Sequence, residues 1–186
     1  MRLFVGVDLP DDLAPAVETV QDELREASGL DFTNPGQAHV TLKFLGETDA
    51  DRIPEIEDAL QAAVADAGVS PFEATVGGIG AFPSTEYIRV VWLGIGRGSE
   101  ELTRLHEAIE ARTVDLGFDP EAHDFTPHVT LARMNHAGGK ELVQRVLRER
   151  DPEVGSMRVG EVRLTESVLG PEGPAYSTVA RFPIGE

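Results

Sequence analysis

The tetrapeptide His-Val-Thr-Leu occurs twice in the chain, at 39–42 and at 128–131, once in each half. In an extended strand, residues i and i+2 point to the same face. Each copy therefore presents an imidazole beside a hydroxyl, His39 with Thr41 and His128 with Thr130. A threonine can donate to a non-bridging phosphate oxygen while a histidine moves a proton. The repeated motif predicts a phosphate site.

Two copies of the motif fit displacement at phosphorus, where the attacking and leaving oxygens lie roughly in line. The attacking water needs a base on one side, and the leaving alkoxide needs an acid on the other. Two facing halves would place His39 and His128 on these opposite sides. Histidine suits both roles because its unperturbed pKa is about 6.5. This chemistry needs no metal and no other cofactor, so we expect none. From the residues alone, the two roles are interchangeable.

The remaining histidines and a metal site are the alternatives. A metal would use the same two motif histidines, yet no carboxylate stands at a regular ligand spacing beside both. His106 lies between Leu102 and Ile109 on a helical face, which is typical of a packing residue. His123 and His136 lie in polar loops. None of the three is predicted to reach the site.

The motifs must be positioned by two similar sets of elements. Apolar spacing predicts helices at 10–29, 51–67, from 99 through 109 with Ser99 as its cap, and at 139–150. Strands are predicted at 2–9, 39–46, 71–83, 87–96, 128–133, 160–170 and 176–185. Both halves thus read strand, helix, motif strand, helix, strand, with one extra strand at the end. We expect an α+β fold in a single bilobal domain, 1–186, with pseudo-repeats of about 1–84 and 85–186 and a seam at 83–86.

Length and composition bound the class of protein. At 186 residues the chain fits one domain or two small lobes that share a core. The absence of cysteine excludes disulfides and thiolate metal sites and fits a reducing compartment. The opening MRLFVGVDLPDD reads as a strand and not as a signal peptide. No apolar run approaches the roughly 18 residues of a membrane helix. We expect a cytoplasmic protein without membrane association.

Net charge is the unusual property of the composition. The formal charge is −17 and the pI is about 4.6. Lys43 and Lys140 are the only lysines, which resembles proteins of salt-loving organisms; a simply acidic mesophilic protein is the alternative. The charge argues against nonspecific nucleic-acid binding, which needs a basic surface. At molar salt the screening length is about 3 Å, so local contacts would decide whether an anionic substrate binds.

Five segments together resemble a known family, the two-histidine phosphoesterases, and within them the RNA 2',3'-cyclic phosphodiesterases, historically named 2'-5' RNA ligases. These segments are RLFVGVDLP, HVTLKFLGE, RVVWLGI, PHVTLAR and LTESVLGPEGPAYSTVARFPI. The resemblance implies a bilobal α+β fold in which two antiparallel sheets line a central cleft and the helices lie outside. It also implies hydrolysis of an RNA terminal 2',3'-cyclic phosphate to a 2'-phosphomonoester.

The resemblance also implies roles for individual residues. By the family pattern, His39 would be the proton donor to the departing 3'-oxygen and His128 the proton acceptor that activates water. Thr41 and Thr130 would hold the non-bridging oxygens. Arg133 matches the arginine that closes the family's second motif and implies a phosphate or ribose contact.

Strand alternation makes three further predictions around the motifs. Arg133 falls on the face opposite His128, so it must lie at a strand end or past a bulge to reach the cleft. By the same alternation Phe44 packs into the core, whereas Lys43 shares the face of His39.

Two other functions remain open. The first is 2'-5' RNA ligation, in which a 5'-hydroxyl replaces water and the same residues serve. The second is a binding module that captures nucleotides or RNA ends without chemistry, although binding alone does not need two proton-transfer groups. In each case RNA ends or cyclic nucleotides are the expected partners, and we expect a monomer.

Overall fold

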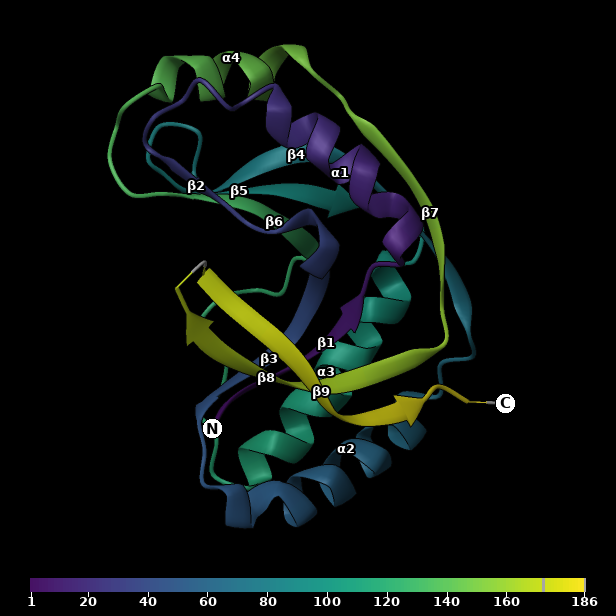
Figure 1. The fold of residues 1–186 in the computed structure, drawn as a ribbon. Helices are drawn as coiled ribbons and strands as arrows, with labels where there is room; N and C mark the ends of the chain where they lie inside the picture. The colour runs from purple at the N-terminus through teal and green to yellow at the C-terminus, as the bar shows by residue number, and fades with distance from the viewer. Residues whose placement is uncertain (172, 186) are drawn as a thin grey trace.

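The computed structural model describes residues 1–171 and 173–185, and in them nine strands alternate with four α-helices (Figure 1). The helices are α1 (Ala14–Asp22), α2 (Ile53–Ala67), α3 (Ser99–Asp115) and α4 (Lys140–Glu149). The strands are β1 (Arg2–Asp8), β2 (Leu30–Phe32), β3 (His39–Glu47), β4 (Phe72–Pro83), β5 (Ile88–Ile95), β6 (His128–Met134), β7 (Glu153–Val159), β8 (Glu161–Gly170) and β9 (Gly173–Pro183).

The strands form antiparallel pairs in the order β7-β4-β5-β6-β3-β1-β8-β9, and β2 pairs with β6. The order has a symmetric centre, because the two motif strands β3 and β6 are neighbours and pair only at Val40 and Val129 among the described residues. Outward from this centre, β3-β1-β8-β9 form one lobe, and β6-β5-β4-β7 with β2 form the other. We call them the β1 lobe and the β5 lobe. The expected α+β bilobal fold is confirmed, but in place of two separate antiparallel sheets the structure has one continuous sheet, whose two halves are joined at this single pair.

The helices cover one face of the sheet in each lobe (Figure 1). In the β1 lobe, α3 contacts β3 and α2 contacts α3 and β9. In the β5 lobe, α1 contacts β6 and β7, and α4 contacts β4. The helix that follows β1 therefore packs on the β5 lobe, and the helix that follows β5 packs on the β1 lobe. The chain crosses repeatedly between the lobes, which locks the two halves of the sequence together.

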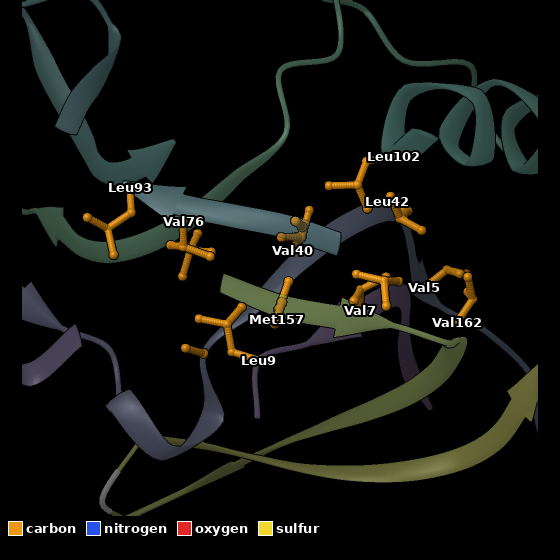
Figure 2. Close-up of a cluster of buried hydrophobic side chains, with 14 of the residues drawn as sticks. Val5, Val7, Leu9, Val40, Leu42, Val76, Leu93, Leu102, Met157 and Val162 are labelled. Carbon is orange, nitrogen blue, oxygen red and sulfur yellow. The ribbon is translucent and has the colours of Figure 1, made fainter. Parts of the chain in front are cut away.

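The core lies between the sheet and these helices. Alternate residues of β1, β3, β5 and β8 point into it, where they meet the apolar stripes of the helices. Figure 2 shows ten of these side chains, which come from both lobes: Val5, Val7, Leu9, Val40, Leu42, Val76, Leu93, Leu102, Met157 and Val162. Within residues 1–171 and 173–185, no α-helix covers the other face of the sheet (Figure 1). We call it the cleft face, and it carries both motif histidines.

Most predicted elements are present, with differences at their ends. The helix expected at 10–29 is shortened to α1, and Gly98, not Ser99, is the N-cap of α3. Strands β2 and β7 were not predicted. Gly68 ends α2 in the left-handed conformation (φ 62°), as expected for a glycine stop. The seam expected at 83–86 falls at the end of β4 and in the turn before β5, inside one lobe, and the two lobes meet at the β3–β6 contact instead. The repeat boundaries themselves stay a prediction.

None of the helices in the described ranges is both long and apolar enough to cross a membrane.

Candidate active site

His39 is the first residue of β3, and His128 is the first residue of β6. Between them, Val40 lies opposite Val129, and both valine side chains are completely buried on the helix-covered face. Because side chains alternate along a strand, both histidines point to the cleft face. The two copies of the motif, one in each half of the sequence, are thus brought to one site.

Thr41 and Thr130 share this face with the histidines, and all four side chains are half-buried. In an antiparallel pair centred on the two valines, His39 lies across from Thr130, and Thr41 lies across from His128. The site therefore combines two imidazoles and two hydroxyls in an alternating arrangement. One histidine and one threonine come from each half of the sequence.

The two imidazoles are held in the same way. His39 Nδ1 lies 3.0 Å from the carbonyl oxygen of Gln37, and His128 Nδ1 lies 2.7 Å from the carbonyl oxygen of Thr126. A carbonyl oxygen can only accept, so each Nδ1 carries a hydrogen and donates it. The opposite ring nitrogen, Nε2, is then the atom that can gain or lose a proton. Both rings are oriented for proton transfer through the same nitrogen.

Aromatic side chains surround both imidazoles. Phe4 stacks on His39 with ring centroids 4.7 Å apart, and Tyr176 meets the same ring edge-on at 5.3 Å. Phe82 meets the ring of His128 edge-on at 5.0 Å. These contacts remove water from the rings and leave each with few alternative orientations. The sequence patterns missed all three aromatic residues, because they lie on β1, β4 and β9, far from the motifs in the sequence.

Burial lowers the pKa of both histidines below the ordinary value of 6.5, and the positive charge of Arg133 lowers both further. For His39, the carboxylate of Asp8 acts in the opposite direction and favours the protonated form. Asp8 lies opposite His39 in the β1–β3 register, and it is not among the groups that shift His128. The electrostatic surroundings of the two histidines are therefore different, although their backbone settings match.

A pocket of about 490 Å³ lies beside His39. Its walls include Asp8, Gln37 and Tyr176, each of which borders the His39 ring or its strand end, and Thr165 on β8. The volume is in the range of pockets that hold small ligands, such as a nucleotide. Burial raises the pKa of Tyr176 above its ordinary value of 10.0, so its hydroxyl stays protonated at neutral pH.

A β-bulge follows the first motif. The β1–β3 register runs from Gly6 opposite Thr41 to Val5 opposite Lys43, so Leu42 is an extra residue without a partner on β1. A bulge reverses the alternation of side chains beyond it.

The second motif carries a bulge at the matching position. The β5–β6 register runs from Trp92 opposite Thr130 to Val91 opposite Ala132, so Leu131 is the extra residue. The burial pattern of the first six residues is the same in both strands: half-buried, buried, half-buried, buried, buried, exposed.

The bulges overturn the predictions for Lys43 and Phe44. They also meet the condition set for Arg133, which had to lie at a strand end or past a bulge. Lys43 was expected on the cleft face, but it is 2% exposed and lies on the helix-covered face. Phe44 was expected in the core, but it is 49% exposed, and its ring centroid lies 6.0 Å from that of Phe4. Both predictions were wrong because strict alternation does not pass through a bulge. Arg133 does lie past a bulge, is exposed, and is near enough to shift the pKa of both motif histidines.

Lys43 has a structural role in place of a cleft contact. Its ammonium group donates to the carboxylate of Glu110 on α3 and to the carbonyl oxygen of Asp119, the latter at 2.6 Å. The same carboxylate accepts from the backbone N–H of Glu121 at 2.9 Å. The ion pair thus ties β3 and α3 to the loop that leads into His128.

The other histidines lie away from the site, as expected. His106 is buried on α3, where its Nδ1 lies 2.7 Å from the carbonyl oxygen of Leu42 and its ring stacks on Phe125 at 4.1 Å. His123 and His136 are exposed in loops.

Comparisons with known proteins agree with this geometry. The model of the 2'-5' RNA ligase superfamily matches residues 9–170. A Methanothermobacter thermautotrophicus protein named RNA 2',3'-cyclic phosphodiesterase is 36% identical over 184 residues, which are 98% of each chain. An Archaeoglobus fulgidus protein of the same name is 35% identical over 182 residues, which cover 98% of this chain and 99% of that one.

Two solved structures share the fold. The crystal structure of the Thermus thermophilus protein TT0787 superposes with a TM-score of 0.80 at 30% identity and covers 99% of this chain and 98% of that one. Escherichia coli LigT, crystallised with 3'-AMP, superposes with a TM-score of 0.79 at 24% identity and covers 100% of this chain and 98% of that one. The family match, the full-length relatives and the shared fold lead to one conclusion: this chain belongs to the 2'-5' RNA ligase superfamily.

Proposed function

We propose that this protein hydrolyses the terminal 2',3'-cyclic phosphodiester of RNA to a 2'-phosphomonoester, by general acid–base catalysis with His39 and His128. The names of the full-length relatives support the reaction. The paired motifs support the mechanism. The single observation that carries the proposal is that two imidazoles, both with Nδ1 bonded to a carbonyl oxygen, share one face of the sheet across the β3–β6 contact.

In the proposed reaction, water attacks phosphorus from the side of His128, whose neutral Nε2 takes the proton from the water as the new P–O bond forms. The bond between phosphorus and the 3'-oxygen breaks on the opposite side. His39 donates the proton of its Nε2 to that departing oxygen, so that a 3'-hydroxyl and a 2'-phosphate result. One proton enters His128 and one leaves His39, and exchange with solvent restores both.

The assignment of acid and base follows the family pattern, and one difference between the surroundings of the two rings agrees with it. A general acid must be protonated when the substrate binds, and the nearby carboxylate of Asp8 favours that form of His39. A general base must be neutral. Burial and the charge of Arg133 lower the pKa of His128 as they do that of His39, but no carboxylate of the described residues favours the protonated form of His128. This electrostatic difference supports the roles that the family pattern implies.

Thr41, Thr130 and Arg133 are proposed to bind the phosphate. The two hydroxyls lie on the face of the imidazoles and suit the non-bridging oxygens. Arg133 would place a positive charge where negative charge accumulates at phosphorus, which is a main source of rate enhancement in phosphoryl transfer. In a chain with a net charge of −17, this local cation counters the repulsion of an anionic substrate.

Ligation is the second candidate, because the family model that matches this chain is that of the 2'-5' RNA ligases. A 5'-hydroxyl in place of water would use the same base and acid in the same positions. The two reactions are separated by adding an RNA with a 5'-hydroxyl end and looking for a joined product.

The site groups named above all come from one chain, so a monomer suffices for the proposed reaction. The monomeric state and the cytoplasmic location expected from the sequence stay predictions, and sedimentation of the purified protein tests the first.

The deciding experiment incubates the protein with 2',3'-cyclic nucleotides in the presence of EDTA, at low and at high salt. We expect hydrolysis that is insensitive to the chelator and yields the 2'-monophosphate. A 3'-monophosphate product would point to a different hydrolase. Tight binding with recovery of unchanged nucleotide would leave only the non-catalytic binding module.

A further inference from the structure

The backbone carbonyl groups of the two bulge residues, Leu42 and Leu131, are each bonded to a side chain of a helix. Leu131 is completely buried on β6, and its carbonyl oxygen accepts a hydrogen bond from Nε2 of Gln21 on α1 at 3.1 Å. Leu42 is buried on β3, and its carbonyl oxygen lies 2.7 Å from Nδ1 of His106 on α3, which must be the donor. The same contact thus occurs once in each lobe.

A bulge needs such a contact for a physical reason. The extra residue has no partner on the strand that pairs with it across the bulge, β1 for Leu42 and β5 for Leu131, and a buried carbonyl group left without any hydrogen bond costs roughly 1–3 kcal/mol. A straight strand would not need the helix donor, so a donor bound at this point favours the bulged form over the regular form.

The Leu131 carbonyl has a second source of hydrogen bonds, in the residue after β2. The backbone N–H of Thr33 donates to it at 3.0 Å and the Thr33 hydroxyl lies 3.1 Å away. Gln21 Nε2 also donates to the carbonyl of Thr33 at 2.8 Å and so holds that residue in place. These acceptors fix the orientation of the Gln21 amide, whose Oε1 is then buried without a hydrogen-bond partner among the residues that the structure describes. In the β1 lobe, His106 is instead held by its stack on Phe125.

We propose that Gln21 and His106 are a matched pair of positioning residues. Each holds the bulge that turns one side chain onto the cleft face, Arg133 in the β5 lobe and Phe44 in the β1 lobe. Neither touches the reacting atoms. This inference rests on the proposed function for its kinetic consequences, but its structural part stands independently.

The two bulges begin after the motif threonines, so their loss leaves the His-x-Thr residues on the cleft face and reverses only the later side chains of each strand. Without the bulge, Phe44 would turn toward the core and Lys43 toward the cleft. In the other lobe, Arg133 would leave the phosphate. Loss of the His106 donor should therefore act through Phe44, whose ring lies beside Phe4, the residue that stacks on His39. Loss of the Gln21 donor should act through Arg133.

Double-mutant cycles test this pairing. His106→Phe keeps a ring to stack on Phe125 but removes the donor, and His106→Asn keeps an N–H at the position of Nδ1 but removes the ring. We expect His106→Phe to lower kcat/KM for a 2',3'-cyclic nucleotide about three- to tenfold and His106→Asn to recover most of the loss. In a protein that already carries Phe44→Ala, His106→Phe should lower kcat/KM little further. In a protein that carries Arg133→Ala, it should lower kcat/KM by the same factor as in the wild-type protein.

The second cycle pairs Gln21→Met, which is similar in volume, with Arg133→Ala. The effect of Gln21→Met on kcat/KM should be non-additive with that of Arg133→Ala and additive with that of Phe44→Ala. Val20→Ala, a buried change in the same helix that removes no hydrogen-bond donor, is the matched control for simple loss of stability. It should lower the melting temperature and leave unchanged the coupling that both double-mutant cycles measure.

One measurement does not depend on activity. Trp92, the only tryptophan, lies opposite Thr130 at the register shift of the Leu131 bulge. Gln21→Met should change its emission spectrum, and His106→Phe should not. Full additivity in both cycles, or equal effects of both variants on Trp92, would overturn the pairing. If the wild-type protein hydrolyses no cyclic nucleotide, the proposed function fails, and the Trp92 spectra still decide the inference.

Discussion

Val40 lies directly opposite Val129, and through this one backbone pair the two motif strands meet. Each valine is flanked by the histidine and the threonine of its own motif. The antiparallel contact therefore sets two imidazoles and two hydroxyls around one position, with no further strand between them. In the proposed mechanism, this arrangement supplies a proton donor and a proton acceptor on opposite sides of a bound phosphorus.

Removal of either imidazole tests the two-histidine mechanism. His39→Ala and His128→Ala should each lower kcat about 10²–10⁴-fold, because a positioned acid or base contributes that much. Binding of inorganic phosphate should persist, since Thr41 and Thr130 remain. His123→Ala, in an exposed loop, is the control and should retain full activity. Full turnover in both motif variants would exclude the mechanism.

The pH dependence of kcat/KM tests the lowered pKa of each histidine. Activity requires neutral His128, so it is lost as the pH falls below the pKa of His128. It also requires protonated His39, so it is lost as the pH rises above the pKa of His39. Because the pKa of each is below 6.5 in the free protein, the bell-shaped profile should be centred below pH 6.5. A profile centred well above that value would contradict the account.

Asp8→Asn tests which histidine is the acid. The carboxylate favours protonated His39, so its removal should lower the pKa of His39 and move the alkaline limb of the profile to lower pH. The acidic limb, assigned to His128, should stay. Arg163, which pairs with Asp8 at 2.8 Å, provides the control, because Arg163→Met breaks the same ion pair but leaves the carboxylate. Movement of the acidic limb in Asp8→Asn would reverse the two roles.

The hydroxyl groups are tested with an isosteric change. Thr41→Val and Thr130→Val remove a donor but preserve shape and strand propensity. A hydrogen bond to a charged group is worth about 1.5–3 kcal/mol, so each variant should lose roughly 10- to 150-fold in kcat/KM. The melting temperature should change little. If both variants kept wild-type kinetics, the hydroxyls would not contact the phosphate.

How far the sequence predicts this site is clearest at residues 39–44. Period-two alternation placed His39 and Thr41 correctly, because they precede the bulge at Leu42. Lys43 and Phe44 come after it and were assigned to the wrong faces. A bulge depends on which strand lies alongside and on the donor that satisfies the freed carbonyl group. That donor is His106, 64 positions away, so no local pattern could reveal it.

The fold, too, has elements that the sequence predicts and elements that it does not. Periodicity identified the motif strands and all four helices, since each buries one continuous apolar face. It missed β2 and β7, of which β2 has only three residues. It also could not show that α1 packs on the opposite lobe from β1, because that depends on long-range contacts. Asp8 and Tyr176 join the site through neighbouring strands and carry no motif of their own.

The Lys43–Glu110 pair gives an asymmetric prediction for stability. Lys43 is 2% exposed, whereas the Glu110 side chain is 22% exposed. Glu110→Gln should be the more harmful change, about 3–5 kcal/mol in the free energy of unfolding, because it leaves a buried ammonium group without a counter-charge. Lys43→Met should cost less, because the carboxylate that remains can reach water. Urea unfolding measures both, and the reverse order would contradict the assignment.

The same pair predicts a loss of stability in acid. Burial alone would raise the pKa of Glu110, but its hydrogen bonds with Lys43 and the Glu121 N–H, together with the charge of Lys43, hold it below the ordinary value of 4.5. A lowered pKa in the folded state contributes stability that is present above pH 4.5 and is lost as the pH falls through the folded-state pKa. Below pH 4.5, the free energy of unfolding should depend less on pH in Glu110→Gln than in the wild-type protein.

The most direct test of the central claim uses two substrates that differ in one atom. In the second substrate, sulfur replaces the 3'-oxygen of the cyclic phosphate, and a thiolate departs without a proton from an acid, since thiols have a pKa of about 8.5. We predict that His39→Ala, which is slow on the oxygen substrate, regains most of the wild-type rate on the sulfur substrate. His128→Ala should stay slow on both. Rescue of His128→Ala instead, or equal rates of the two variants on both substrates, would contradict a proton donor at His39 and a proton acceptor at His128.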